Sequence, residues 1–222
     1  MITINKFEDL VNKVQYKGLG FSLEIEVYSC CKSDMSGQLR VNLGMSNSYD
    51  PVRDDKNLGT IIENYRKFLK EGKNDAAQSY FETKIELLEG QIEKTQFPFP
   101  NFTTEFILIL STVDENRRKL MNFYYDRVIK DNLGNIVKNV SEAFKKIDNT
   151  ISVREFSIKE DELHDNYQLD VSNFKEIPIK SLLIFDDIID TGATLNQLLL
   201  RLSQEKIIDN KTVIKMIVLY NN

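Results

Sequence analysis

Hydrophobic and polar residues alternate with a period of two near the start of the chain. In FSLEIEVY, residues 21–28, apolar side chains at every second position are separated by serine and glutamates. QLRVNLGM, residues 38–45, follows after the turn-forming residues SDMSG. Strict alternation predicts a half-buried strand, and two such runs joined by turn residues predict a β-hairpin with one solvent-facing side.

The pattern changes to a helical period over residues 58–71 and 75–94. Apolar residues recur there three and four positions apart: Ile61, Ile62, Tyr65, Phe68 and Leu69 in the first segment, and Ala77, Tyr80, Phe81, Ile85, Leu88 and Ile92 in the second. A stripe of this kind follows one face of a helix, so the two segments are predicted to be amphipathic helices.

A break in the pattern follows at QFPFPNF, residues 96–102. It holds two prolines in three positions, which are incompatible with a helix and favour an extended connector. We place a domain boundary here. Residues 1–100 are predicted to form an N-terminal lobe of hairpin and helices, either a cover for a substrate or a partner-binding part, and residues 101–222 a second domain.

In the second domain, strand-like and helix-like segments are interleaved. The predicted order is strand 105–110, helix 115–130, helix 135–147, strand 150–157, a long acidic loop, strand 181–185, helix 194–204 and strand 213–220. Strands interleaved with helices are typical of a parallel sheet covered on both faces. The sequence therefore predicts the α/β class.

The stretch LLIFDDIIDTGATL, residues 182–195, carries the strongest chemical signal in the chain. Its apolar run is typical of a buried parallel strand, and Asp186 and Asp187 follow where that strand is predicted to end. Ligands of open α/β sheets bind beyond the carboxyl ends of strands. Residues 190–194, Asp-Thr-Gly-Ala-Thr, then lead into a helix, whose free amides favour a phosphate. Phosphate and diol binding together indicate a phosphorylated ribose.

This stretch resembles the signature of the type I phosphoribosyltransferases. The resemblance implies that Asp186 and Asp187 bind the ribose hydroxyls of phosphoribosyl pyrophosphate (PRPP), and Mg²⁺ through water. It also implies that the turn made of Asp190, Thr191, Gly192, Ala193 and Thr194 binds the 5-phosphate. Asp190, at the first position of the turn, would lie near the ring nitrogen of the acceptor base and act as a catalytic general base or as a hydrogen-bond anchor.

Two other interpretations of the acidic stretch remain open. The letters DDIID also match the Asp-Asp-x-x-Asp box of isoprenyl diphosphate synthases, where the acids lie on a helix and bind Mg²⁺–diphosphate. A solvent-exposed loop that matches the motif by chance is the plainest alternative.

The resemblance also requires a pyrophosphate-binding part after the first core strand. The corresponding segment is STVDENRRKL, in which Ser111 and Thr112 can supply amides and Arg117 and Arg118 positive charge. Arg154, near the end of the strand predicted at 150–157, is a further candidate. Arginines at the start of an exposed helix are otherwise ordinary solvated residues.

Residues 158–178 stand where the family has a mobile lid. This loop is mostly acidic and offers Lys159 as a cation, and His164, the sole histidine of the chain, is expected to be solvent-exposed. A helix-rich leader followed by such a loop resembles the ComF-like subgroup, although the zinc-binding cysteine cluster of many members is missing. Cys30 and Cys31 are adjacent and are expected to be inert thiols.

Charge and composition limit the classes of partner that the chain is expected to bind. The net charge is −5 without any Lys/Arg-rich tract, so nucleic-acid binding is not indicated. No apolar run approaches the roughly 20 residues that span a bilayer, and the start of the chain lacks a signal-peptide core, so we expect a cytoplasmic protein with no membrane partner.

Together these features predict a magnesium-dependent phosphoribosyltransferase of nucleotide metabolism. It would bind PRPP or another ribose 5-phosphate-containing nucleotide, transfer the phosphoribosyl group to a nucleobase and release pyrophosphate, with a second copy of the chain (a homodimer) as a candidate partner. The alternative is a module that senses PRPP or a nucleotide without catalysing a reaction.

Overall fold

A computed structural model gives the fold of most of the chain. It describes residues 2–4, 11–16, 21, 23–32, 58–93, 96–99, 101–110, 112, 114–133, 137–147, 167–174, 177–189 and 192–221. The predicted strand at 150–157 and the second strand of the predicted hairpin, residues 38–45, lie outside these ranges. None of the helices in the described part of the chain has the length and hydrophobicity that a bilayer crossing requires.

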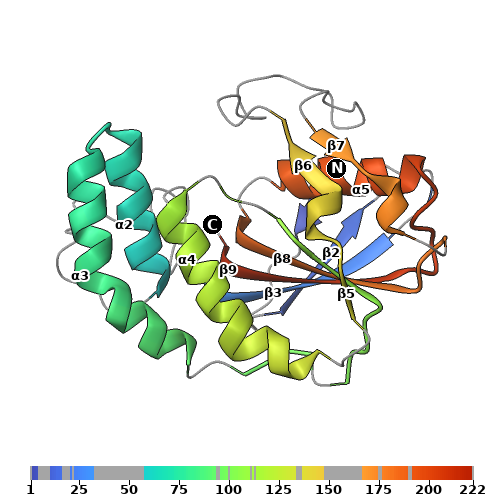
Figure 1. Cartoon of the computed structure of the whole chain (residues 1–222), viewed down its shortest axis with the longest axis horizontal. Helices are drawn as coiled ribbons and strands as arrows, with labels where there is room; N and C mark the ends of the chain where they lie inside the picture. The colour runs from blue at the N-terminus through green and yellow to red at the C-terminus, as the bar shows by residue number, and fades with distance from the viewer. Residues whose placement is uncertain are drawn as a thin grey trace.

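Among the described residues, the central element is a seven-stranded sheet (Figure 1). Its strands lie in the order β1 (Ile2–Ile4), β2 (Val11–Tyr16), β3 (Leu23–Lys32), β9 (Val213–Asn221), β8 (Ser181–Ile189), β4 (Phe106–Ile109) and β5 (Lys138–Asn139). The five strands from β3 to β5 run parallel, whereas β1 and β2 are antiparallel to their neighbours. The predicted α/β class with a parallel sheet is confirmed.

Two hydrophobic layers cover the parallel part of the sheet. On one face, helix α5 (Ala193–Gln204) and the small antiparallel pair β6 (Phe144–Lys146) and β7 (Tyr167–Leu169) pack against the strands. On the other face lie helices α2 (Leu58–Lys70), α3 (Asn74–Ile92) and α4 (Glu115–Tyr124). Figure 1 shows α2 and α3 side by side, with α4 next to them. Helix α2 packs directly against β3 and β9, and α4 packs against β8.

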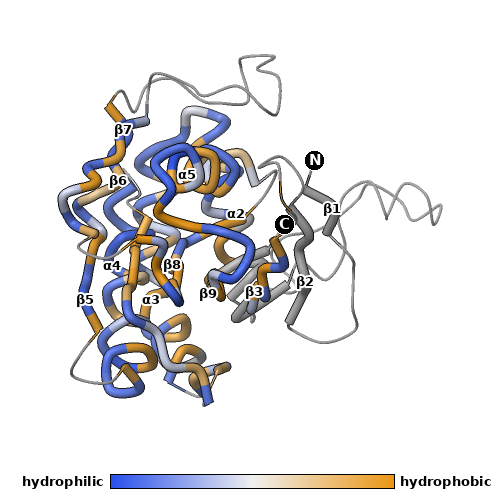
Figure 2. Tube along the Cα trace, turned by 90° about the vertical axis from the view of Figure 1, so that its right-hand side faces the viewer, coloured by the Kyte–Doolittle hydropathy of each residue, from blue (hydrophilic) through white to orange (hydrophobic). Residues whose placement is uncertain are grey.

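Alternation along β8 explains why both faces are apolar. Leu182 and Ile184 belong to the layer under α5, and Leu183 and Phe185 to the layer under α4, and all four are essentially inaccessible to solvent. Successive side chains of a strand point to opposite faces, so an unbroken apolar run is what a central strand requires. Figure 2 shows hydrophobic residues on β8 and β9 in the interior of the molecule.

Strand β3 comes from the segment that the sequence assigns to the N-terminal lobe, yet it lies in the same sheet as β8. It pairs with β2 on one side and runs parallel to β9 on the other, and Lys215 Nζ of β9 lies 2.7 Å from Glu26 Oε2. The predicted alternation is correct: Leu23, Ile25 and Val27 are buried. The antiparallel partner in the structure is β2, which precedes β3, whereas the sequence predicted residues 38–45.

Both helices predicted in the first hundred residues are confirmed as α2 and α3. They pack through their apolar stripes, where the rings of Tyr65 and Phe81 lie 5.2 Å apart. The helix predicted at 115–130 is divided: α4 ends at Tyr124, a π-helical turn spans Tyr125–Ile129, and a 3₁₀ turn spans Lys130–Asn132.

The helix predicted at 135–147 is wrong. The described residues there form β5, a 3₁₀ turn (Ser141–Ala143) and β6. The amides of Lys138 and Val140 bond to carbonyls of β4 and the residue before it, and the Ser141 hydroxyl accepts a bond from the Ile109 amide. Pairing with a neighbouring strand therefore outweighs a weak helical pattern that contains two asparagines.

Candidate functional site

The acidic pair lies in the carboxyl-terminal half of β8, past the point where β4 stops. The last β4–β8 pair is Ile109 with Phe185, and the Leu110 amide bonds to the Phe185 carbonyl at 2.8 Å. Beyond it, Asp186 pairs with Val218 of β9, which continues to the end of β8. Asp186 and Asp187 therefore lie at the carboxyl edge of the sheet, where ligands of this fold class bind.

The strand was predicted to end at Phe185, and this boundary is wrong because β9 supplies hydrogen-bond partners as far as Ile189. The longer strand removes one interpretation of the acids. A helix through DDIID, which the isoprenyl diphosphate synthase interpretation needs, is contradicted by the extended backbone of residues 186–189.

Asp186 and Asp187 differ in surroundings although they are adjacent. The Asp187 side chain is only 8% exposed and faces α4, whereas Asp186 is half-buried. The Asp187 amide donates to Asp186 Oδ1 at 2.8 Å. Burial raises the pKa of Asp186 well above its ordinary value, and repulsion by the Asp187 carboxylate adds to the rise. The ionised form of Asp186 is therefore destabilised in the folded protein.

Arg117 of α4 provides the positive charge of the site. Its Nη1 lies 2.8 Å from Asp187 Oδ2, and its side chain is 22% exposed. Its Nε is buried and finds no hydrogen-bond acceptor among the described residues. The sequence singled out Arg117 as a candidate for the pyrophosphate side, and the structure brings it onto one of the two predicted ribose-binding acids. Arg118 is exposed.

The start of α4 is capped by an acid. Asp114 is the N-cap residue, and its Oδ1 accepts a bond from the Arg117 amide at 2.9 Å. The Thr112 hydroxyl lies 3.4 Å from the Asp114 amide. In the described residues of this segment, a side-chain carboxylate therefore fills the position that an open anion-binding turn would leave free. Ser111 lies outside the described residues.

A tyrosine from α2 reaches the same place, which the sequence did not predict. Tyr65 donates its hydroxyl to Asp114 Oδ2 at 2.8 Å and accepts from Asn116 Nδ2 at 3.2 Å. Burial raises the pKa of Tyr65 to about 12. In the sequence Tyr65 fits the apolar stripe of a helix, and only its hydroxyl suggested that it would need a polar partner once buried.

The glycine of the predicted phosphate turn has the conformation that this turn needs. Gly192 has φ 74°, in the left-handed region, and is the N-cap residue of α5 without a side-chain cap. Ala193 and Thr194 then form the first turn, and the Asn196 amide bonds to the Gly192 carbonyl at 2.8 Å. The amides of this first turn are thus available to an anion as far as the described residues show.

Tyr167 of β7 is a second residue that the sequence did not identify. Its ring stacks on Phe144 with centroids 5.3 Å apart. Burial raises the pKa of Tyr167, the nearby Asp186 carboxylate adds to the rise, and a hydrogen bond with Thr194 opposes it. Tyr167 therefore lies beside both Asp186 and the start of α5. It falls within the segment that the sequence treated as an irregular acidic loop, so no pattern marked it.

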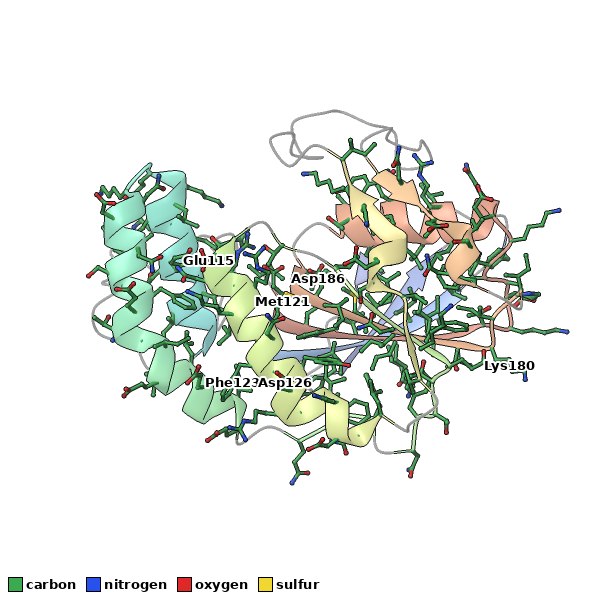
Figure 3. The ribbon with its side chains drawn as sticks, viewed as in Figure 1. Glu115, Met121, Phe123, Asp126, Lys180 and Asp186 are labelled. Carbon is green, nitrogen blue, oxygen red and sulfur yellow. The ribbon has the colours of Figure 1, made fainter. Side chains whose placement is uncertain are left out.

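Figure 3 places the site at one end of the sheet. Asp186 lies on the same side of the molecule as Glu115, the first residue of α4, whereas Lys180, just before β8, lies at the opposite end. Other candidate residues lie outside the described part of the chain: Arg154, Lys159, His164, Asp190 and Thr191.

Asp186 fits a bound cation better than Asp187. The raised pKa of Asp186 partly reflects repulsion that a divalent cation would relieve, whereas Asp187 already has Arg117 as its counter-ion. No group of three or more acidic, histidine or cysteine side chains in the described residues is arranged to hold a metal by itself. A magnesium ion would accordingly take most of its ligands from water or a bound phosphate.

No protein-family model and no curated protein matches the sequence at a significant level.

Proposed function

We propose that the chain binds PRPP or a related ribose 5-phosphate at the carboxyl edge of β8 and transfers the phosphoribosyl group to a nitrogenous base, with release of pyrophosphate. The phosphoribosyltransferase-like fold and the Mg²⁺ requirement are parts of this proposal. One observation carries it: two adjacent carboxylates lie past the end of β4, a few residues before a left-handed glycine that opens α5.

Each part of this arrangement suits one part of the ligand. Carboxylates accept hydrogen bonds from neighbouring sugar hydroxyls, which supports Asp186 and Asp187 as the diol-binding pair. The uncapped first turn of α5, from Ala193, suits the 5-phosphate because its amides and the helix dipole favour an anion. The two aspartates and the first turn of α5 belong to one strand–loop–helix segment. This continuity favours a single ribose phosphate that contacts both the aspartates and the turn.

In the proposed reaction, a base nitrogen attacks C1 of the ribose while the bond from C1 to pyrophosphate breaks. When bound, Mg²⁺ would neutralise charge on the diphosphate and meet the protein at Asp186. The chain itself would position the sugar through its hydroxyls and 5-phosphate, and Asp187 would stabilise positive charge on the sugar ring. Arg117 is the cation paired with Asp187, and it would offset negative charge next to the diol-binding acids.

Calorimetric titration with PRPP tests the binding step. We expect the wild type to bind, and Asp186→Asn together with Asp187→Asn to weaken binding by roughly 1–3 kcal/mol, the range for hydrogen bonds to charged groups. Asp126→Asn is the matched control, because this side chain is 61% exposed and lies in the π-helical turn that follows α4. Equal affinity in the double variant and the wild type would remove the diol assignment.

A second candidate is a module that binds the same ligand without turnover. It is favoured by the Asp114 cap, which occupies the start of α4 where a pyrophosphate-binding turn would be needed, and by the Arg117–Asp187 ion pair. Release of pyrophosphate from PRPP, measured over a panel of bases, separates the two. Binding without release from any base would favour sensing, and release with one base would establish the enzyme.

A further inference from the structure

Arg117 lies between two carboxylates that compete for it. Its Nη1 is 2.8 Å from Asp187 Oδ2, and its Nε is 3.9 Å from Asp114 Oδ1. The first distance is that of a direct ion pair, whereas the second is too long for a hydrogen bond. Both acids are largely buried, with side chains 8% and 11% exposed, so each of them would gain from a full contact with the guanidinium.

The two oxygens of Asp114 already have other partners. Oδ1 accepts from the Arg117 amide at 2.9 Å, and Oδ2 accepts from the Tyr65 hydroxyl at 2.8 Å. Asn116 Nδ2 in turn donates to the Tyr65 hydroxyl and to Gln78 Oε1, which ties the tyrosine to α3 and α4. The orientation of the Asp114 carboxylate is thus fixed from α2.

We infer that Tyr65 is a positioning residue for the site: by occupying Asp114 Oδ2, its hydroxyl keeps this carboxylate from taking Arg117 and leaves the guanidinium on Asp187. The residue acts through Asp114 and touches no ligand. Its effect on ligand affinity rests on the proposed function, whereas its effect on Arg117 does not.

The consequence concerns the charge of the acidic pair. While Arg117 stays on Asp187, that carboxylate is compensated and can remain an acceptor beside Asp186. If Arg117 moved to Asp114, two adjacent carboxylates would be left without a described counter-ion, and the pair would bind a sugar diol less well. Because the pKa of Tyr65 is about 12, its hydroxyl keeps its proton and its bond to Asp114 at neutral pH.

Side-chain NMR of Arg117 tests the inference without any ligand, using arginine labelled with ¹⁵N and assigned by Arg117→Lys. A guanidinium held by Asp187 should give separate, slowly exchanging Nη signals. We expect Tyr65→Phe to broaden or shift these signals. Tyr80→Phe is the matched control, since the Tyr80 hydroxyl meets Asn64 instead and this substitution removes the same atom elsewhere.

Asp114→Asn distinguishes a positioning role of Tyr65 from a purely structural role. Asparagine is as good a helix cap as aspartate, but its neutral amide does not compete for a guanidinium. We therefore expect Asp114→Asn to keep the Arg117 signals, and Tyr65→Phe combined with Asp114→Asn to restore them. A purely structural role for Tyr65 predicts no such rescue. Urea unfolding of each variant shows that it is folded.

Titration with ribose 5-phosphate completes the test. We expect Tyr65→Phe to lower affinity by about threefold to tenfold, the equivalent of one net hydrogen bond, and the double variant to recover it. Unchanged Arg117 signals in Tyr65→Phe, or unchanged affinity despite altered signals, overturn the inference. A third outcome separates the two proposals. If the Arg117 signals change in Tyr65→Phe and are restored in the double variant, but the wild type does not bind ribose 5-phosphate, the positioning role is supported and the proposed function is rejected.

Discussion

The two neighbouring aspartates of β8 have different electrostatic surroundings. Asp187 points toward α4 and has Arg117 as a counter-ion at 2.8 Å. Asp186 lies on the side of Tyr167 and α5, and it is the acid whose pKa is raised. Strand geometry produces this separation, since consecutive side chains face opposite sides of a sheet. Adjacent acids of this strand therefore face different partners: Arg117 for Asp187, and the side of Tyr167 for Asp186.

The raised pKa of Asp186 predicts a stability that depends on pH. The folded state holds this proton more tightly than the unfolded state, so the free energy of unfolding falls as pH rises from the unfolded pKa, about 3.9, through the folded pKa. Asp186→Asn removes this loss. We expect the variant to be more stable than the wild type at pH 7 and to bind PRPP more weakly, a trade common at functional sites.

Urea unfolding between pH 4 and pH 8 measures the effect, with Asp126→Asn as the exposed control. The difference between Asp186→Asn and the wild type should shrink toward pH 4, where the wild-type carboxyl approaches full protonation in the folded state and is about half protonated in the unfolded state. A variant that is less stable than the wild type throughout this range would mean that the ionised carboxylate is stabilised in the fold.

The sequence predicted some of the site residues for physical reasons and missed others. Asp186 and Asp187 were predictable because an unbroken apolar run followed by two acids marks the point where a buried strand leaves the core. Tyr65 and Asp114 were not, because they are 49 residues apart and meet only when α2 packs beside α4. A tyrosine in an apolar stripe carries no local sign of which buried acceptor its hydroxyl will reach.

Among the elements, the start of α5 depends most strictly on one residue. Gly192 has φ 74°, and an L-residue in that region costs roughly 1–2 kcal/mol. We expect Gly192→Ala to lower the free energy of unfolding by about 1 kcal/mol or more, measured by urea denaturation. It should also weaken ribose 5-phosphate binding, because the turn would shift.

Gly90 provides the contrasting substitution. It lies within α3, has an ordinary φ, and a Cβ there meets nothing within 4 Å. Replacing a helical glycine by alanine raises stability by about 0.5–1 kcal/mol, so Gly90→Ala should stabilise the protein and leave binding unchanged. If Gly192→Ala and Gly90→Ala changed the free energy of unfolding in the same direction, the left-handed conformation of residue 192 would not explain the effect of Gly192→Ala.

Element prediction succeeded where a segment is long and strongly periodic and failed where pairing partners decide. α2, α3 and α5 have apolar stripes over at least three turns, and their positions are correct within a few residues. Residues 138–146 instead take their conformation from β4 and β7, which lie far away in the sequence. The end of β8 was similarly set by the length of β9.

At the scale of the whole molecule, the first hundred residues contribute to the central sheet. Leu23, Ile25 and Val27 of β3 pack in the same hydrophobic layer as α5 and β8. A fragment of residues 101–222 would leave β9 as an edge strand and expose this layer. We expect that fragment to lack cooperative unfolding in urea, whereas the full chain shows one transition. A fragment that unfolds cooperatively would establish 101–222 as an independent domain.

The parallel pairing of β3 with β9 also has a consequence for biosynthesis. Glu26 and Lys215 face each other across this pair although 189 residues separate them in the chain. While the ribosome is still making the intervening residues, one edge of β3 has no partner and its apolar side chains have no complete layer to enter. Such exposed edges are where nascent chains associate with one another or with chaperones. The sheet can therefore close only after translation has passed β9, and the protein should depend on chaperones more than its modest size suggests.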